Sequence, residues 1–179
     1  MDEKVFCKIT DEDFGMQLFE ENNPVIRLGA RGLVFNSKGE VAVFNKTAKN
    51  EFKLPGGGIE ESEDLKTAFL REVMEETGCM VEIMEFLGVI EEHKTRNNFI
   101  QRSYVFVSRV VNDTGELHLT EKEEKEGAQL LWKPINVAFE LVSNCKENLI
   151  ESEYDDLYKS IFMVERDKRI LKYYLENNI

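Results

Sequence analysis

Three glutamates have a spacing that places them together on an α-helix: Glu75 and Glu76 follow Glu72 by three and four positions. At roughly 100° per residue they share an arc of about 100° on one helix face. Like-charged neighbours of this kind cost about 0.2–0.5 kcal/mol each. A divalent cation would turn that cost into a gain, because hard cations such as Mg²⁺ take oxygen ligands. The spacing therefore indicates either a metal site or a solvated acidic helix face.

A glycine triplet, Gly56, Gly57 and Gly58, precedes these glutamates within the segment Leu-Pro-Gly-Gly-Gly, which we expect to be irregular. Glycine lets the backbone approach a ligand closely and adopt positive φ. The loop leads to a helix N-terminus, where free N–H groups and the helix dipole favour anions. Carbonyls freed by such a loop can also bind a cation. Loop and acidic helix together predict a site for a metal and a diphosphate, although the triplet alone could be a simple turn.

A longer pattern joins the loop to the helix. The segment from Gly57 to Cys79 resembles the Nudix box, G-x5-E-x7-R-E-U-x-E-E-x-G-U with U apolar, at every fixed position. Val73 fills the first apolar slot and Cys79 the second, where an aliphatic residue is more usual. The resemblance in layout extends from about Val25 to Trp132. It implies metal-dependent hydrolysis of a diphosphate, in which a metal-activated water attacks phosphorus.

The resemblance also implies roles for the matching residues. Glu72, Glu75 and Glu76 would bind the metal, Mg²⁺ or Mn²⁺, with the carbonyl of Gly56 as a further ligand. Glu72 would also be a candidate for the base that activates water. Arg71 resembles the arginine that holds the glutamates in position.

Glu63 resembles the partner of that arginine. In this family a base or ligand can also come from a later loop, for which residues 121–126 offer Glu123 and Glu124 among four glutamates. The sequence does not choose among them, and the run could equally be solvated.

Substrate phosphates are expected at the backbone of Gly57 and Gly58. Arg27 and Arg31 could also approach those phosphates, or they could face solvent from a strand.

The overall charge restricts the partners. The 179 residues include 23 Lys and Arg against 35 Asp and Glu, a formal net charge of −12. So acidic a chain is repelled by nucleic-acid backbones and anionic membranes, whereas a small nucleotide can bind if divalent cations screen the contact. Three widely spaced cysteines and a start without a leader pattern predict a cytoplasmic protein. No apolar run approaches membrane-spanning length.

Hydrophobic periodicity and turn residues predict the elements that must position this site. We expect Ser62 and Asn136 to cap helices and Gly78 to end one. Residues 1–24 read as an edge strand or a loose arm, and residues 112–127 as a charged loop. The predicted strands cover 25–35, 41–45, 81–91, 99–111 and 128–132, and the predicted helices cover 63–77, 136–146 and 153–176.

Strands and helices mix without regular βαβ alternation, which predicts one α/β domain over 1–179, a Nudix-like α/β/α sandwich with a mixed β-sheet. The C-terminal helix would cover the core or form the seam of a homodimer. The substrate would be a nucleoside triphosphate, including an oxidised one, or a nucleotide sugar such as ADP-ribose. The alternative is a catalytically inactive Nudix-fold module with a nucleotide-binding or regulatory function. The complete set of glutamates argues against this alternative.

Overall fold

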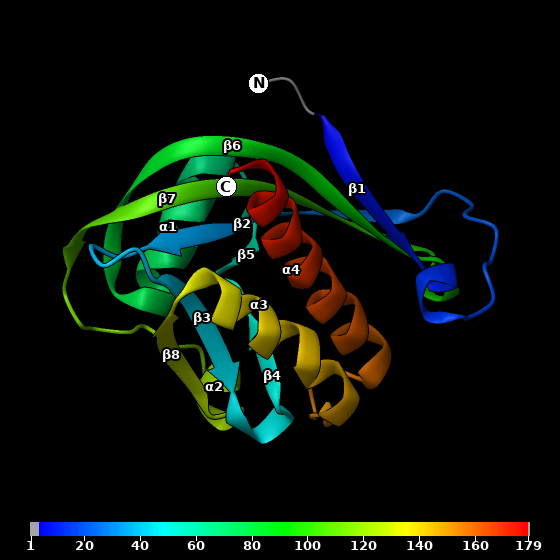
Figure 1. Ribbon diagram of the computed structural model, residues 1–179. Helices are drawn as coiled ribbons and strands as arrows, with labels where there is room; N and C mark the ends of the chain where they lie inside the picture. Colours follow the sequence, from blue (N-terminus) through cyan, green and yellow to red (C-terminus); the bar gives the residue numbers. More distant parts are fainter. Residues whose placement is uncertain (1–3, 179) are drawn as a thin grey trace.

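A mixed β-sheet forms the centre of the computed structural model, which describes residues 4–178 (Figure 1). Its main path follows the order β1-β6-β7-β2-β3-β4, while β5 pairs with β2 and β8 pairs with β3. The sequence predicts no leader pattern at its start, and residues 1–3 of that segment lie outside the described residues. The strands are β1 (Val5–Thr10), β2 (Val25–Phe35), β3 (Val41–Lys46), β4 (Glu51–Lys53), β5 (Gly56–Gly58), β6 (Cys79–Lys94), β7 (Phe99–Asp113) and β8 (Ala128–Lys133).

The sheet is mixed because β7 runs parallel to β2 on one side and antiparallel to β6 on the other. The N-terminal segment contributes β1, which lies at an edge of the sheet and runs parallel to β6. A 3₁₀ helix over Asp11–Phe14 follows β1 directly. The strands β6 and β7 extend a few residues beyond their predicted ends and bend across the molecule (Figure 1).

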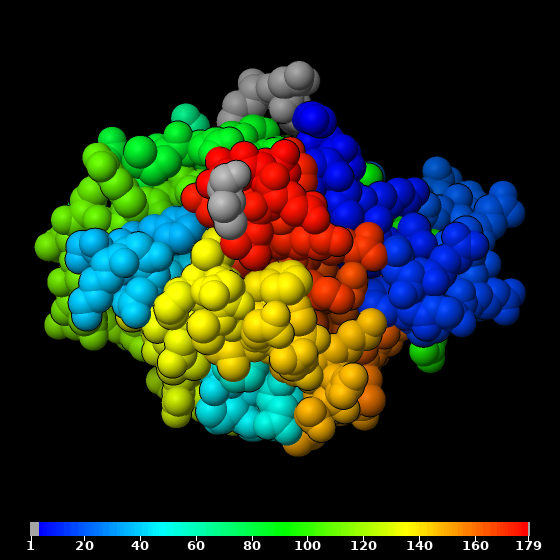
Figure 2. Space-filling model, in the orientation of Figure 1, coloured from blue at the N-terminus to red at the C-terminus, as the bar shows by residue number. Residues whose placement is uncertain are grey.

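Helices cover both faces of this sheet. On one face lies α1, and on the other α3 and α4 pack against each other, as their adjoining yellow and red surfaces show in Figure 2. None of the helices in the described part of the chain is long and apolar enough to cross a membrane. The helices are α1 (Leu65–Thr77), α2 (Glu121–Lys125), α3 (Ile135–Asn144) and α4 (Leu157–Asn177).

Two separate hydrophobic cores lie on the two faces. Successive side chains of a strand point to opposite faces, so Ala30 and Leu33 of β2 enter different cores, as do Val105 and Phe106 of β7. The core that contains Ala30 and Phe106 is completed by Phe69 of α1. The other core is completed by α3 and α4. The predicted α/β/α sandwich with a mixed sheet is therefore confirmed.

The start of α1 differs from the prediction, whereas its end agrees. Ser62 was expected to cap the helix, but it has a positive φ of 69° and precedes the cap. Asp64 is the N-cap, and its carboxylate accepts hydrogen bonds from the backbone N–H groups of Lys66 and Thr67. A carboxylate satisfies free N–H groups at a helix start as well as a hydroxyl does. Gly78 adopts the left-handed conformation that ends α1, as predicted.

Two other helix starts and one loop also differ. The helix predicted from Asn136 begins at Ile135, and Pro134, which has no N–H to leave unpaired at a helix start, is its N-cap. The last helix begins at Leu157, because Asp156 caps it and residues 153–155 precede that cap. The predicted charged loop 112–127 contains α2, which begins with a capping box between Thr120 and Glu123.

Candidate active site

The glycine triplet forms the short strand β5 rather than an irregular loop. Gly56, Gly57 and Gly58 pair antiparallel with β2, and Gly56 lies opposite Arg31. Gly56 has a φ of +133°, a conformation that side chains rarely adopt. A Cβ at this position would also lie 2.5 Å from Cα of Arg31. Glycine is therefore required at position 56 so that the chain can pair with β2 beside the last turn of the acidic helix.

Arg71 of α1 holds the acidic residues around this strand. Its guanidinium donates to both carboxylate oxygens of Glu63 over 2.9 and 3.0 Å, and to Gly58 O over 3.1 Å. The same group donates to Glu72 over 2.9 Å and to Glu75 over 3.2 Å. Hydrogen bonding to Glu63 raises the pKa of Arg71 and lowers the pKa of Glu63. One guanidinium thus links the loop before α1 to two of its glutamates.

Glu72 packs directly against the glycine strand. A Cβ added to Gly57 would lie 2.5 Å from the carboxyl carbon and from both oxygens of Glu72. Burial raises the pKa of Glu72, although the hydrogen bond from Arg71 acts in the opposite direction. Glu75 is the most exposed of the three glutamates, with 41% of its side-chain surface accessible. The carboxylate of Glu72 can occupy this position only because residue 57 has no side chain.

Glu76 is buried, unlike Glu75. Its Oε1 accepts from Lys53 Nζ over 2.6 Å, and its Oε2 accepts from the backbone N–H of Gly56 over 2.8 Å. Burial raises the pKa of Glu76, and the charge of Lys53 opposes that rise. Lys53 was not predicted as a site residue, although its position three residues before Gly56 marks it as a neighbour of the glycine strand.

The donor set fits a hard divalent cation in its chemistry. Carboxylate and carbonyl oxygens are the ligands that Mg²⁺ and Mn²⁺ take, and Glu72, Glu75 and Glu76 all lie on the side of α1 that meets the glycine strand. The described residues nevertheless contain no group of three His, Cys, Asp or Glu side chains already arranged to hold an ion. In the described structure these carboxylates are paired with Arg71 and Lys53.

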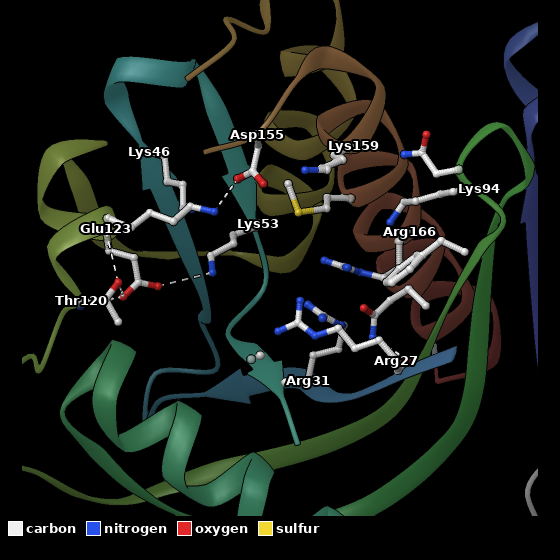
Figure 3. Close-up of a pocket in the computed structure, with 18 residues that line it drawn as sticks. Arg27, Arg31, Lys46, Lys53, Lys94, Thr120, Glu123, Asp155, Lys159 and Arg166 are labelled. Carbon is white, nitrogen blue, oxygen red and sulfur yellow. Dashed lines mark hydrogen bonds and ion pairs between the residues drawn. The ribbon is translucent and has the colours of Figure 1, made fainter. Parts of the chain in front are cut away.

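A cavity of about 480 Å³ opens beside the glycine strand, a size typical of small-ligand sites. Gly56, Gly57 and Gly58 form part of its wall, and Glu123 and Asp155 are its only acidic residues within the described chain. Cationic side chains dominate the lining (Figure 3), a marked reversal in a protein with a net charge of −12. They are Arg27, Arg31, Lys46, Lys53, Lys94, Lys122, Lys159 and Arg166.

Both arginines predicted to bind substrate line this cavity. Arg31 is only 6% exposed and donates from Nε to Ser103 Oγ over 3.1 Å. Burial, together with the nearby charge of Arg166, lowers the pKa of Arg31 to about 10. Arg27 lies over the glycine strand, because a Cβ added to Gly58 would lie 2.6 Å from Arg27 Nη2. The even spacing of the two arginines on β2 places them on one face.

The two glutamates considered in the later loop have different positions. Glu123 lines the cavity, accepts from the hydroxyl of Thr120 over 2.9 Å and lies 3.8 Å from Lys53 Nζ. Burial alone would raise the pKa of Glu123, but Lys53 and the bonds from Thr120 lower it overall. Glu124 is exposed and is not part of the lining. Lys53 therefore lies between Glu76 on α1 and Glu123 on α2.

Comparison with known proteins decides the family. The family model of the NUDIX domain matches residues 25–152. The chain belongs to the Nudix family. Nudix hydrolase 7 of Arabidopsis thaliana is 31% identical over 144 residues, which cover 71% of this Nudix chain and 50% of that protein. The chain thus spans half the length of this relative, and the family match ends before α4 begins at Leu157.

Solved structures share the Nudix fold. The MutT protein from Methanosarcina mazei Go1 superposes with a TM-score of 0.54 at 21% identity, over 88% of this chain and 99% of its own. A NUDIX hydrolase from Nitrosomonas europaea gives a TM-score of 0.59 at 15% identity, over 84% of this chain and 88% of its own. At such identities the likeness establishes the fold.

Proposed function

We propose that this protein is a divalent-metal-dependent hydrolase that cleaves a diphosphate linkage in a nucleoside diphosphate-linked substrate. The observation that carries the proposal is a convergence at Gly56, Gly57 and Gly58. The carboxylates of α1 meet these glycines from one side, and the cationic cavity opens beside them on another. A diphosphate needs both an acidic metal site and cations for its remaining charge.

The catalytic metal, Mg²⁺ or Mn²⁺, would be held by Glu72, Glu75, Glu76 and the carbonyl of Gly56. When bound, it supplies Lewis-acid stabilisation of the phosphate oxygens and a more acidic water. Glu72 is our candidate for the base, because its carboxylate lies against Gly57, where the cavity wall has no side chain to keep a reacting water away.

The remaining residues position the glutamates or neutralise the charge of the substrate. Arg71, held by Glu63, orients Glu72 and Glu75 without contacting the cavity itself. Arg31 presents a buried guanidinium to the substrate charge. One guanidinium group can bind two oxygens of the same phosphate, which suits a phosphate close to the glycine strand.

Glu123 is our candidate for a further acidic group from the later loop, because it lines the cavity whereas Glu124 does not. Lys53 separates Glu123 from Glu76 and lines the same cavity, so it can also contact a substrate phosphate. The name of the Arabidopsis relative, a Nudix hydrolase, supports a hydrolytic rather than a purely regulatory function.

The test is release of phosphate or pyrophosphate from a nucleotide panel with Mg²⁺ or Mn²⁺. The panel contains nucleoside triphosphates, 8-oxo-dGTP, ADP-ribose, dinucleoside polyphosphates and capped RNA. We expect turnover of at least one compound, and reversible loss of turnover in EDTA. No turnover of any compound would favour the regulatory alternative, and full activity in EDTA would exclude a required metal.

Glu75→Gln is the variant of choice, because Glu75 is partly exposed and pairs with Arg71, whereas Glu76→Gln would leave the partly buried Lys53 without its 2.6 Å carboxylate partner. Loss of one charged ligand should lower turnover by about 10²-fold or more, with the fold retained. Glu82→Gln is the matched control, since Glu82 is 53% exposed and pairs with Arg109. Equal rates in both variants would contradict the metal assignment.

A further inference from the structure

We propose that α4 builds a second anion site in the cavity, which selects substrates that carry phosphate groups beyond the scissile diphosphate. The inference rests on the proposed function, because it names the substrate class of the same cavity. Figure 3 shows Lys94, Lys159 and Arg166 together on one side of the cavity, across from Lys53 and Glu123. The scissile diphosphate would bind beside the glycine strand. These three cations would therefore bind a different part of the ligand.

The position of the cations on α4 is regular. Lys159, Met163 and Arg166 are related by four and seven positions, which places them on one helix face. All three line the cavity. They also lie outside residues 25–152, the part of the chain that matches the family model. This wall of the cavity therefore comes from a helix that lies beyond the part of the chain matched by the family model.

Buried ion pairs hold Arg166 in place. Its Nε donates to Asp167 over 2.7 Å, and its Nη1 donates to Glu92 over 3.1 Å. Lys94 donates to the same Glu92 over 2.9 Å. Asp167 in turn accepts from the backbone N–H of Leu54, just before the glycine strand. Two cations that line the cavity thus share the carboxylate of Glu92, and α4 is fixed to the chain that leads into the site.

Three other lining cations pair with no carboxylate in the described part of the chain: Arg27, Arg31 and Lys159. The other five lining cations lie within 4.0 Å of six carboxylates, those of Glu76, Glu92, Glu123, Glu126, Asp155 and Asp167. Eight positive and six negative charges leave +2, in a protein whose total is −12. Arg31 is also 94% removed from solvent, by its exposure of 6%. A buried cation without a carboxylate partner is costly, and a multiply charged anion would offset that cost.

The lining offers little to a nucleobase. Phe99 is the only aromatic side chain among the described lining residues, and Lys94 Nζ lies 5.7 Å from its ring centroid. Stacking a base needs an open aromatic face. The cavity is therefore suited to phosphate groups, carried either on a linear chain, as in a nucleoside triphosphate, or around a ring.

Equilibrium binding tests the proposal separately from catalysis. Isothermal titration calorimetry of the full chain in EDTA compares pyrophosphate, tripolyphosphate and inositol hexakisphosphate at about 0.15 M ionic strength, where distant charges are screened. We expect tripolyphosphate, inositol hexakisphosphate or both to bind at least about tenfold more tightly than pyrophosphate. Tighter binding of tripolyphosphate would identify a linear chain, and tighter binding of inositol hexakisphosphate a ring; both support the second site. Equal affinities for all three would overturn it.

Lys159→Gln provides the residue-level test. Lys159 is exposed and has no ion pair in the described structure, so the variant should fold normally. The variant should reduce the preference for tripolyphosphate or inositol hexakisphosphate over pyrophosphate by about fivefold or more, as expected for loss of one phosphate-binding cation. Lys172→Gln on the same helix is the control, since Lys172 is 60% exposed and outside the cavity. An equal effect of both variants, or an equal loss for every ligand, would refute the inference.

The outcome also separates this inference from the proposed function. If the nucleotide panel gives no turnover but the binding preference depends on Lys159, the second anion site stands and the hydrolase proposal falls. If turnover is found but all three anions bind with equal affinity, the hydrolase proposal is supported and α4 does not select the substrate.

Discussion

Gly57→Ala is the perturbation that tests the geometry of the site most directly. The added Cβ would lie 2.5 Å from the carboxyl carbon and both oxygens of Glu72, whereas ordinary contacts begin at 3.4 Å. The carboxylate must therefore retreat by the difference, about 0.9 Å. Residue 57 does not have a positive φ, and the obstacle is the end of a flexible side chain. The variant can thus fold with Glu72 displaced.

The expected effect on activity is much larger than the effect on stability. A misplacement of about 1 Å in a catalytic group can cost about 10²-fold in rate, which equals about 3 kcal/mol of transition-state stabilisation. Displacing Glu72 also weakens its 2.9 Å ion pair with Arg71. Because Arg71 retains 24% side-chain exposure, that loss should stay below about 1 kcal/mol of unfolding free energy.

The assay pairs kcat/KM on the best substrate of the panel with thermal unfolding followed by circular dichroism. Gly56→Ala is the comparison, because its φ of +133° and its contact with the backbone of Arg31 should destabilise the fold itself. A folded Gly57→Ala protein with wild-type kcat/KM would refute the reasoning. So would a Gly57→Ala protein that unfolds as readily as Gly56→Ala, since the conflict would then not be confined to Glu72.

Two further predictions concern stability. Arg71→Gln should lower Tm in EDTA by about 3–6 °C, because the glutamates on α1 lose their shared guanidinium, and Mg²⁺ should restore part of that loss; unchanged melting with and without Mg²⁺ would contradict it. Burial opposes ionisation of Glu92, yet Arg166 and Lys94 lower its pKa from 4.5 to about 2. A lowered pKa means that Glu92 stabilises the fold above pH 4.5 and loses this contribution, about 3 kcal/mol, as the pH falls toward 2. Urea unfolding across this range should therefore show a shallower acid loss for Glu92→Gln than for wild type, and identical slopes would exclude this role.

Much of the framework follows from local patterns. Alternating residues in 99–111 indicated a strand correctly, as did the run 25–35, and Gly78 marked the end of α1 because glycine readily adopts the left-handed conformation of that stop. Where two residues could serve equally, the prediction failed: both Ser62 and Asp64 are suitable caps, and only the geometry of the helix start selects Asp64. The short α2 was missed because its five charged residues have no apolar periodicity.

The cationic cavity could not be predicted, because its members are far apart in sequence. Lys53 comes from β4, Lys94 from β6 and Lys159 from α4, and in an acidic chain none of them forms a cluster along the sequence. The net charge of −12 led to an expectation that divalent cations would have to screen the phosphates. The fold in addition gathers basic side chains beside the glycine strand, and Glu76 is paired with Lys53.

The two hydrophobic cores have a consequence for how this protein can change. Phe69 of α1 packs on one face of the sheet, and Phe162 of α4 packs on the other, in clusters that share no buried residue. Substitutions at distant sites without shared partners have nearly additive effects. Variation at the exposed lining residue Lys159 can therefore alter the proposed ligand selectivity without repacking the helix that carries the proposed metal-binding carboxylates, whereas a change at Asp167, which bonds Leu54 beside the glycine strand, would affect both.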